Sequence, residues 1–243
     1  GAANHLKSSV DHLVSSGFSL LKIDFLFAGT FNAPRSTGIT PMASYDLAMR
    51  YIREAAGPET ILLGVGAPPI AGFAALDAWR IGPDVAVPQF DASWYFVQGT
   101  ARSTAARWFF CEYHLCDGDP ALLRGFERKE VETATLIAAL AGGAFFLSDD
   151  LRLIDNERRS WLTAEMVELG ISGEASHPVD GSLLDVPFQL QSQLGAQVTS
   201  ISGHQLPLKW RLPNEKTLMV NVSDESINIE GATIEARGHI LLD

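Results

Sequence analysis

Residues 18–25 read Phe-Ser-Leu-Leu-Lys-Ile-Asp-Phe, a short apolar run set between two amphipathic segments. The flanking segments are His5–Ser16 and Ser44–Ala56, and both carry apolar residues at helical spacing. This spacing predicts a helix on each side of the run, and the run itself predicts a buried strand. A buried strand between helices is typical of parallel sheets with crossover connections.

The same alternation continues along the chain to about Gly170. It predicts five strand–helix repeats of the kind that build a (β/α) barrel, which has eight in its complete form. The sequence therefore predicts an α/β fold with a partial TIM-type barrel. The further expected strands are Thr60–Val65, Leu76–Ile81, Glu112–Cys116 and Ala144–Ser148, and the further expected helices are Trp94–Phe110, Glu127–Ala141 and Asn156–Leu162.

The last part of the chain has a different pattern. From about Glu174 onward, short alternating stretches are separated by Pro, Asn, Asp and Gly, which indicates antiparallel strands. We expect a small antiparallel β-sandwich over residues 173–243, after a barrel domain over residues 1–172. The expected strands are Leu206–Leu212, Thr217–Val222, Ile227–Ile229 and Ile234–Leu242.

Composition narrows the class of partner. The chain has 243 residues, 47% of them apolar, and a formal net charge of −11. A net negative charge argues against nucleic acid or an anionic membrane surface as the partner, because both require a basic face. The longest apolar run, about Leu136 to Leu147, is too short to span a bilayer. The start shows no signal peptide, so we expect a cytoplasmic protein with Cys111 and Cys116 reduced.

Lys22 and Asp24 carry the first candidate chemistry. Alternate residues of a strand share a face, so these two side chains point the same way. In a barrel this places a cation and a carboxylate together at the carboxyl-terminal rim, where active sites lie. An isolated Lys-x-Asp is more often a structural ion pair.

A second candidate follows another expected strand. The stretch Arg80-Ile81-Gly82-Pro83-Asp84-Val85 breaks the strand at Gly-Pro and turns the chain over the rim. Arg80 and Asp84 flank this turn. Taken alone, such an aspartate more often caps the next element than acts in catalysis.

Together, the two segments supply two aspartates at the ends of different parallel strands. A retaining glycoside hydrolase needs such a pair, one ionised to attack the anomeric carbon and one protonated to assist the leaving oxygen. Lys22 favours the ionised form of Asp24, whose charge in turn favours a protonated Asp84. We expect their carboxyl groups to face one cleft roughly 5–6 Å apart.

Four motifs in this order resemble the α-galactosidases of glycoside hydrolase family 36. They are Lys22-Ile23-Asp24-Phe25, Leu62-Leu63-Gly64-Val65-Gly66-Ala67-Pro68, the stretch from Arg80 to Val85, and Leu147-Ser148-Asp149-Asp150-Leu151. The resemblance covers nearly the whole chain. It implies strands 4 to 8 of the catalytic barrel followed by a C-terminal β domain.

The resemblance also implies residue roles. Asp24 matches the nucleophile and Asp84 the general acid/base. Lys22 and Arg80 match residues that bind sugar hydroxyls, and Val65 stands where relatives often carry a cysteine that lines the sugar pocket. The family needs no cofactor, and its partner is an α-galactoside oligosaccharide.

Other residues leave alternatives open. Trp94 could stack on a sugar face, or it could be a packing residue. Asp117 and Asp119 could bind a metal, but without a neighbouring His they form a poor site, so we predict a solvated loop and no metal. In relatives the loop reads Asn-Asp-Pro-Asp-Cys, whereas this chain reads Cys116-Asp117-Gly118-Asp119-Pro120.

Three readings of function remain open. The chain could be a retaining α-galactosidase, a related α-N-acetylgalactosaminidase or galactosyl transferase, or a non-catalytic carbohydrate-binding or interaction fragment. The absence of three barrel strands motivates the last reading. Such a cut would leave open sheet edges and an apolar face, so we expect a homodimer or pairing with the missing N-terminal half.

Overall fold

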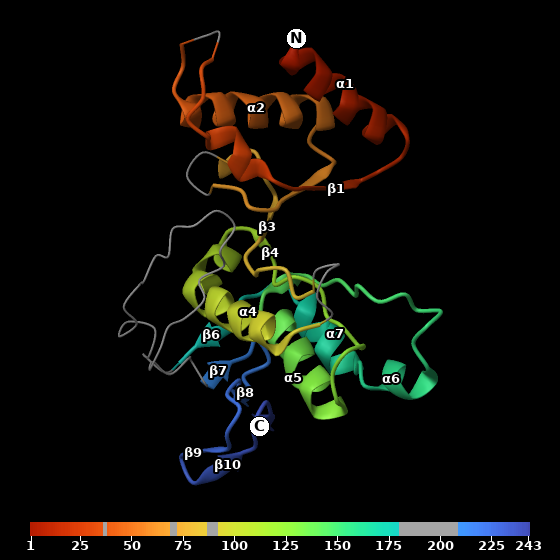
Figure 1. Cartoon of the computed structure of the whole chain (residues 1–243), viewed down its shortest axis with the longest axis vertical. Helices are drawn as coiled ribbons and strands as arrows, with labels where there is room; N and C mark the ends of the chain where they lie inside the picture. Colours follow the sequence, from red (N-terminus) through yellow and green to blue (C-terminus); the bar gives the residue numbers. More distant parts are fainter. Residues whose placement is uncertain (36–37, 69–71, 87–91, 180–208) are drawn as a thin grey trace. The chain divides into compact units, whose positions relative to one another are not determined.

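The computed structural model describes residues 1–35, 38–68, 72–86, 92–179 and 209–243. The chain forms two compact units, Gly1–Arg80 and Ile81–Asp243 (Figure 1). Both units contain parallel strands that alternate with helices, which confirms the mixed α/β class with parallel pairing. The expected domain boundary between residues 172 and 173 stays a prediction.

The first unit holds three short parallel strands. Strand β2 pairs in parallel with both β1 and β3, in a register that aligns Ile23, Gly64 and Trp79. Helices α1 and α2 lie side by side (Figure 1). The elements are α1 (Ala2–Ser15), β1 (Leu20–Ile23), the 3₁₀ helix η1 (Leu26–Thr30), α2 (Pro41–Ala56), β2 (Ile61–Gly64) and β3 (Ala78–Arg80).

The start of α2 differs from the expectation. The sequence predicted Ser44 as the first residue, but the helix begins at Pro41 and is capped by Thr40. The Thr40 hydroxyl accepts a hydrogen bond from the Ala43 amide at 3.2 Å. Proline at the first helical position has no amide hydrogen to satisfy, so Thr-Pro was the stronger start signal.

The second unit begins with a parallel strand pair and its helices. Strand β4 pairs in parallel with β5, with an irregularity between Cys116 and Asp117. The expected strand Ala144–Ser148 is wrong in position, because β5 ends at Ala144 and only Leu147 adds a single parallel bridge, to Ala121. The elements are α4 (Trp94–Arg107), the 3₁₀ helix η2 (Trp108–Glu112), β4 (Leu115–Asp117), α5 (Arg128–Ala139), β5 (Gly142–Ala144), α6 (Asn156–Ser160) and α7 (Ala164–Gly170).

Antiparallel strands complete the second unit, as expected. Four of them form a sheet in the order β11-β8-β7-β6, and β9 and β10 form a separate hairpin. The expected strand Leu206–Leu212 is observed from Lys209, and its first three residues lie outside the described part. The strands are β6 (His177–Pro178), β7 (Lys209–Arg211), β8 (Thr217–Val220), β9 (Ile227–Ile229), β10 (Ala232–Ile234) and β11 (His239–Leu242).

One apolar core joins this sheet to the helices of the same unit. Buried residues of β7 and β8, including Trp210 and Leu218, pack with Val97 of α4 and Ile137 of α5. Polar contacts cross the same boundary, such as the pair between Thr133 Oγ1 and His239 Nδ1 at 2.8 Å. The antiparallel sheet thus packs on helices, and a sandwich of two facing sheets stays a prediction. No helix within the described ranges combines the length and the apolar composition that a bilayer crossing requires.

Candidate active site

The carboxyl ends of the three strands in the first unit lie next to one another. Because the register aligns Ile23, Gly64 and Trp79, the next residues along each strand are Asp24, Val65 and Arg80. The ladder continues past the strand ends, with the Val65 amide donating to the Ile23 carbonyl at 2.8 Å. Neighbouring strands lie about 4.8 Å apart, so these three positions form one row at the sheet edge.

Lys22 lies behind this row, on β1. Its register partners are Leu63 on β2 and, through Leu63, Ala78 on β3. Lys22 lies within β1 and Asp24 directly follows its last residue, Ile23, so the predicted common direction of the two side chains stays a prediction. Both side chains are exposed, whereas Val65 is buried.

The backbone turns sharply after Asp24. Phe25 has a positive φ of 57°, a conformation that a non-glycine residue rarely adopts. Its amide donates to Asp24 Oδ1 at 2.6 Å. A hydrogen bond of this length restricts rotation of the side chain. The local geometry therefore fixes the orientation of the Asp24 carboxyl group at the end of β1.

A hollow of about 440 Å³ lies beside β1 within the first unit. Its lining is mainly apolar and comes from α1, α2 and the whole length of β1. Lys22 and Asp24 contribute its charged groups. Strand β1 is at the end of the strand order, and within the described residues it pairs with β2 alone.

Sequence reasoning did not single out the aromatic residues that follow Asp24. Phe25, Phe27 and Phe31 are all exposed, and their rings form a chain with centroid separations of 5.9 and 5.7 Å. The aromatic spacing Phe-x-Phe-x-x-x-Phe was visible in the sequence. A 3₁₀ helix with this spacing could not be predicted from it.

Asp84 belongs to the second unit, in the turn that follows β3. Two hydrogen bonds fix the backbone of Ile81 at the start of this turn: the Ile81 amide donates to the Asp117 carbonyl at 2.8 Å, and Arg107 Nη1 donates to the Ile81 carbonyl at 2.7 Å. Burial lowers the pKa of Arg107 below its usual value. Asp84 itself is half-buried. The expected cleft between Asp24 and Asp84 concerns both units together and stays a prediction.

Trp94 lies in the core of the second unit. Only 6% of its surface is exposed, its indole Nε1 donates to the Val222 carbonyl at 2.8 Å, and its ring meets Phe126 edge-on. The Arg237 guanidinium lies 5.5 Å from the ring centroid. These contacts fit the packing alternative that the sequence left open, and a role in sugar stacking stays a prediction.

The loop that contains Asp117 and Asp119 is not solvated, in contrast to the expectation. Asp117 is fully buried and Asp119 is 6% exposed. Asp119 Oδ2 accepts a hydrogen bond from the Val85 amide at 2.7 Å, and Asp117 Oδ1 accepts one from the Asp119 amide at 2.8 Å. Both carboxylates thus bond to backbone amides. No cluster of three or more potential metal-ligating side chains occurs in the part of the chain that is described.

Both cysteines are free, as expected. Cys116 is buried in β4, and Cys111 is partly exposed in η2. A hydrogen bond with Cys111, together with burial, raises the pKa of the Cys116 thiol well above its usual value. The Cys116 thiol is therefore not poised as a nucleophile at neutral pH.

No protein-family model matches this chain. Among solved structures, it is similar to an α-galactosidase from Thermus thermophilus in complex with stachyose, with 27% identity and a TM-score of 0.53. That match covers 66% of this chain and 38% of the other.

Two further structures share the fold over nearly the whole chain. α-Galactosidase I from Mortierella vinacea has 14% identity and a TM-score of 0.60, with coverage of 98% of this chain and 70% of the other. An isomalto-dextranase from Arthrobacter globiformis in complex with panose has 18% identity and a TM-score of 0.61, with coverage of 99% and 46%. The chain thus has the fold of glycoside hydrolases and spans less than half of two of these three relatives.

Proposed function

We propose that this chain carries the catalytic aspartates of a retaining glycoside hydrolase of family 36, and that the enzyme acts on α-galactosides. The observation that carries the proposal is the strand register of the first unit, which aligns Asp24, Val65 and Arg80 at one sheet edge with Lys22 behind them. The 27% identity with an α-galactosidase bound to stachyose supports the choice of sugar.

Asp24 is the nucleophile in this proposal. Its carboxylate attacks the anomeric carbon while the glycosidic bond breaks, and Asp84 gives its proton to the leaving oxygen. Asp84 then removes a proton from water, which attacks the same carbon and releases Asp24. Each step inverts the anomeric carbon, so the product keeps the configuration of the substrate. The reaction needs no cofactor.

The residues beside Asp24 position the sugar. Lys22 on β1 and Arg80 on β3, the strands that flank β2, supply hydrogen-bond donors for sugar hydroxyls. Val65 is held between the two strands and limits the space beside the sugar. Holding a substrate in its reactive geometry can supply about 7–11 kcal/mol of barrier reduction.

The isolated chain is expected to turn over slowly. The chain spans 38% and 46% of two structures that it matches, and in this proposal further barrel strands supply additional residues that position the sugar. We therefore expect activity to rise strongly in the full-length gene product. Pairing of the exposed β1 edge, through a homodimer or an N-terminal half, is part of the same proposal.

The test is hydrolysis of aryl glycosides by the chain alone and by its full-length gene product. We expect turnover of aryl α-galactosides, with retention at the anomeric carbon when the first product is followed by NMR. A panel with α-N-acetylgalactosaminide, β-galactoside and α-glucoside defines the sugar. Transfer to a sugar acceptor at low concentration, with little release to water, would instead indicate a transferase.

The rival reading has a distinct signature. A carbohydrate-binding fragment would bind galactosides in calorimetry while the full-length product hydrolyses none of the panel. Product formation with inversion would also contradict the proposal, because inverting enzymes use the two carboxylates in a different geometry.

A further inference from the structure

We infer that Asp119 is a positioning residue for Asp84: its buried carboxylate fixes the peptide unit that joins Asp84 to Val85. This inference rests on the proposed function and deepens it. The contact is direct, since Asp119 Oδ2 accepts the Val85 amide hydrogen at 2.7 Å. A bond to that amide restricts rotation on the carboxyl side of Asp84, and so sets the direction in which its side chain leaves the backbone.

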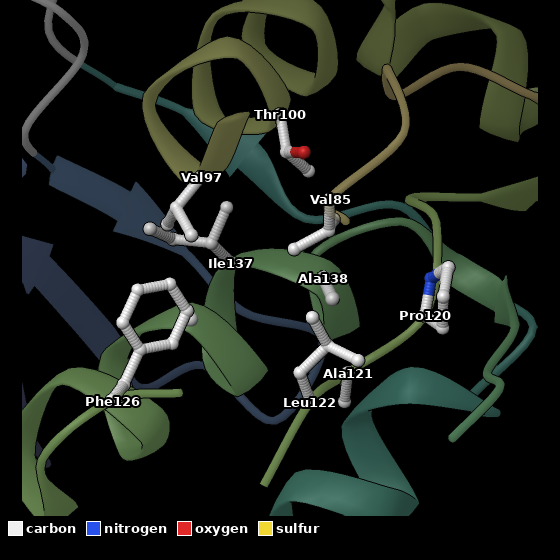
Figure 2. A pocket seen from close by; sticks show the side chains of 10 residues that line it. Val85, Val97, Thr100, Pro120, Ala121, Leu122, Phe126, Ile137 and Ala138 are labelled. Carbon is white, nitrogen blue, oxygen red and sulfur yellow. The ribbon is translucent and has the colours of Figure 1, made fainter. Parts of the chain in front are cut away.

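The Val85 side chain holds the other side of this peptide unit. Val85 is 5% exposed and lies in the core of the second unit. Figure 2 shows it between Thr100 of α4 and Ala138 of α5, beside a small cavity of about 10 Å³. A cavity of this size is at the lower limit for one water molecule. Val85 is therefore fixed by packing on its side chain and by Asp119 on its amide.

The loop that carries Asp119 is itself fixed. A Cβ on Gly82 would lie 2.3 Å from the Gly118 carbonyl oxygen, and one on Gly118 would lie 2.6 Å from the Ala138 carbonyl oxygen. The Asp84 turn, the Asp119 loop and helix α5 are thus stacked at backbone contact. This stacking leaves the turn little freedom to move away from Asp119.

Asp119 has a strained backbone conformation and a buried carboxylate, and both are unfavourable for an aspartate in a loop. It has a positive φ of 76°, which is strained for a residue with a side chain. Its neighbour Asp117 accepts its amide hydrogen and is fully buried. Burying a carboxylate is unfavourable unless hydrogen bonds compensate. Asp117 and Asp119 are both buried beside this turn, and the backbone amides that they bond supply this compensation.

The test compares Asp119→Ala with Asp119→Asn in the full-length gene product. The Asn side chain keeps an oxygen that can accept the Val85 amide hydrogen, and Asn tolerates a positive φ. Rates are measured on two aryl α-galactosides, one with a good leaving group that needs no protonation and one with a poor leaving group that does. We expect Asp119→Ala to lose about 10²-fold on the poor leaving group and little on the good one, since small misplacements can cost this much.

Asp149→Ala is the matched control. Asp149 is another aspartate of the same unit that anchors a loop, with Oδ2 accepting the Leu123 amide at 2.7 Å. A purely structural loss lowers both rates by the same factor, and we expect this pattern for Asp149→Ala. Asp119→Asn should recover most of the poor-leaving-group rate. Equal loss on both substrates for Asp119→Ala, or no recovery with Asn, would overturn the inference.

A second readout keeps the inference separate from the proposed function. If the wild-type protein hydrolyses no galactoside, the proposed function fails. The carboxyl carbon chemical shift of Asp84, with hydrogen exchange of the Val85 amide, then decides the inference alone. A changed Asp84 signal and faster exchange in Asp119→Ala, but not in Asp149→Ala, support positioning. An unchanged Asp84 signal overturns it.

Discussion

The two proposed catalytic aspartates are held in different ways. Asp24 is placed by strand register, at the end of β1, with one hydrogen bond from the next amide. Asp84 is placed by a turn that is bonded to Arg107 and to Asp119 and stacked on Gly118. The position of the proposed nucleophile depends on the pairing of the whole sheet, whereas the position of the proposed acid depends on a few hydrogen bonds and backbone contacts. Substitutions at the two sites should therefore have different effects on activity and stability.

The largest effect is expected for Asp24→Ala. Removal of the nucleophile should lower turnover of aryl α-galactosides by about 10⁴-fold or more, as loss of a nucleophile does in other hydrolases. Added azide should restore product formation as the galactosyl azide of inverted configuration. Asp46→Asn is the control, because Asp46 lies on α2 of the same unit in an exposed pair with Arg50. An active Asp24→Ala would refute the role of Asp24.

The second largest effect is expected for Asp84→Ala. General acid catalysis contributes about 10²–10⁴-fold, so substrates with a poor leaving group should lose this much while activated ones lose far less. Asp150→Asn is the matched control in the same unit, since Asp150 is exposed and paired with Arg152. Equal losses on both substrates would remove Asp84 from the role of acid.

A pair of glycine variants compares the two regions directly. Gly82→Ala would bring the new Cβ to 2.3 Å from the Gly118 carbonyl oxygen, which can move only if the loop moves. The free energy of unfolding should therefore fall by about 1–3 kcal/mol. Gly64→Ala would meet the end of the Leu76 side chain at 2.5 Å, which can rotate away, and the Ala67 Cβ at 3.0 Å, which must shift by only a few tenths of an ångström. Urea unfolding should show the larger loss for Gly82→Ala. The reverse order would mean that the Asp84 turn is the softer of the two regions.

The smallest effect concerns pH and the second unit. Burial lowers the pKa of His239 below its usual 6.5, so the unfolded chain binds a proton more readily than the folded one. Stability should therefore fall as pH drops through 6.5 and level off below the folded pKa. The size of the change reports how far burial lowers the pKa of His239. Its measure is the free energy of unfolding at pH 7.5 and 5.5.

His239→Gln tests the source of this pH dependence. The variant should lose that part of it, whereas His12→Gln, at an exposed position of α1, should keep it. An unchanged pH dependence in His239→Gln would assign the effect to other groups.

Sequence patterns predicted the helices and strands better than the tertiary contacts between them. The strand around Lys22 and Asp24 and the helix from Trp94 were found because burial imposes a clear period on them. The helix α7 and the strand β6 were missed, since both are short. The start of α2 was misplaced because Ser44 was favoured over Thr40-Pro41.

The site shows the same limit. Alternation along one strand predicted that Lys22 and Asp24 share a face, and the register of β1 with β2 places Asp24 beside Val65. The role of Asp119 could not be predicted, because its partner Val85 lies in a distant part of the sequence and burial of the loop depends on packing against α5. A solvated loop was the reasonable expectation for an Asp-Gly-Asp stretch, and tertiary contacts overrode it.

Covalent trapping tests the central claim most directly. An activated 5-fluoro-α-galactosyl fluoride forms the glycosyl-enzyme of a retaining α-galactosidase but releases it slowly, so the modified residue can be mapped by mass spectrometry of peptides. The account predicts one added fluorogalactosyl group per full-length chain, located at Asp24 and absent in Asp24→Ala. Label at another carboxylate, or none while the wild-type protein turns over galactosides, would contradict it.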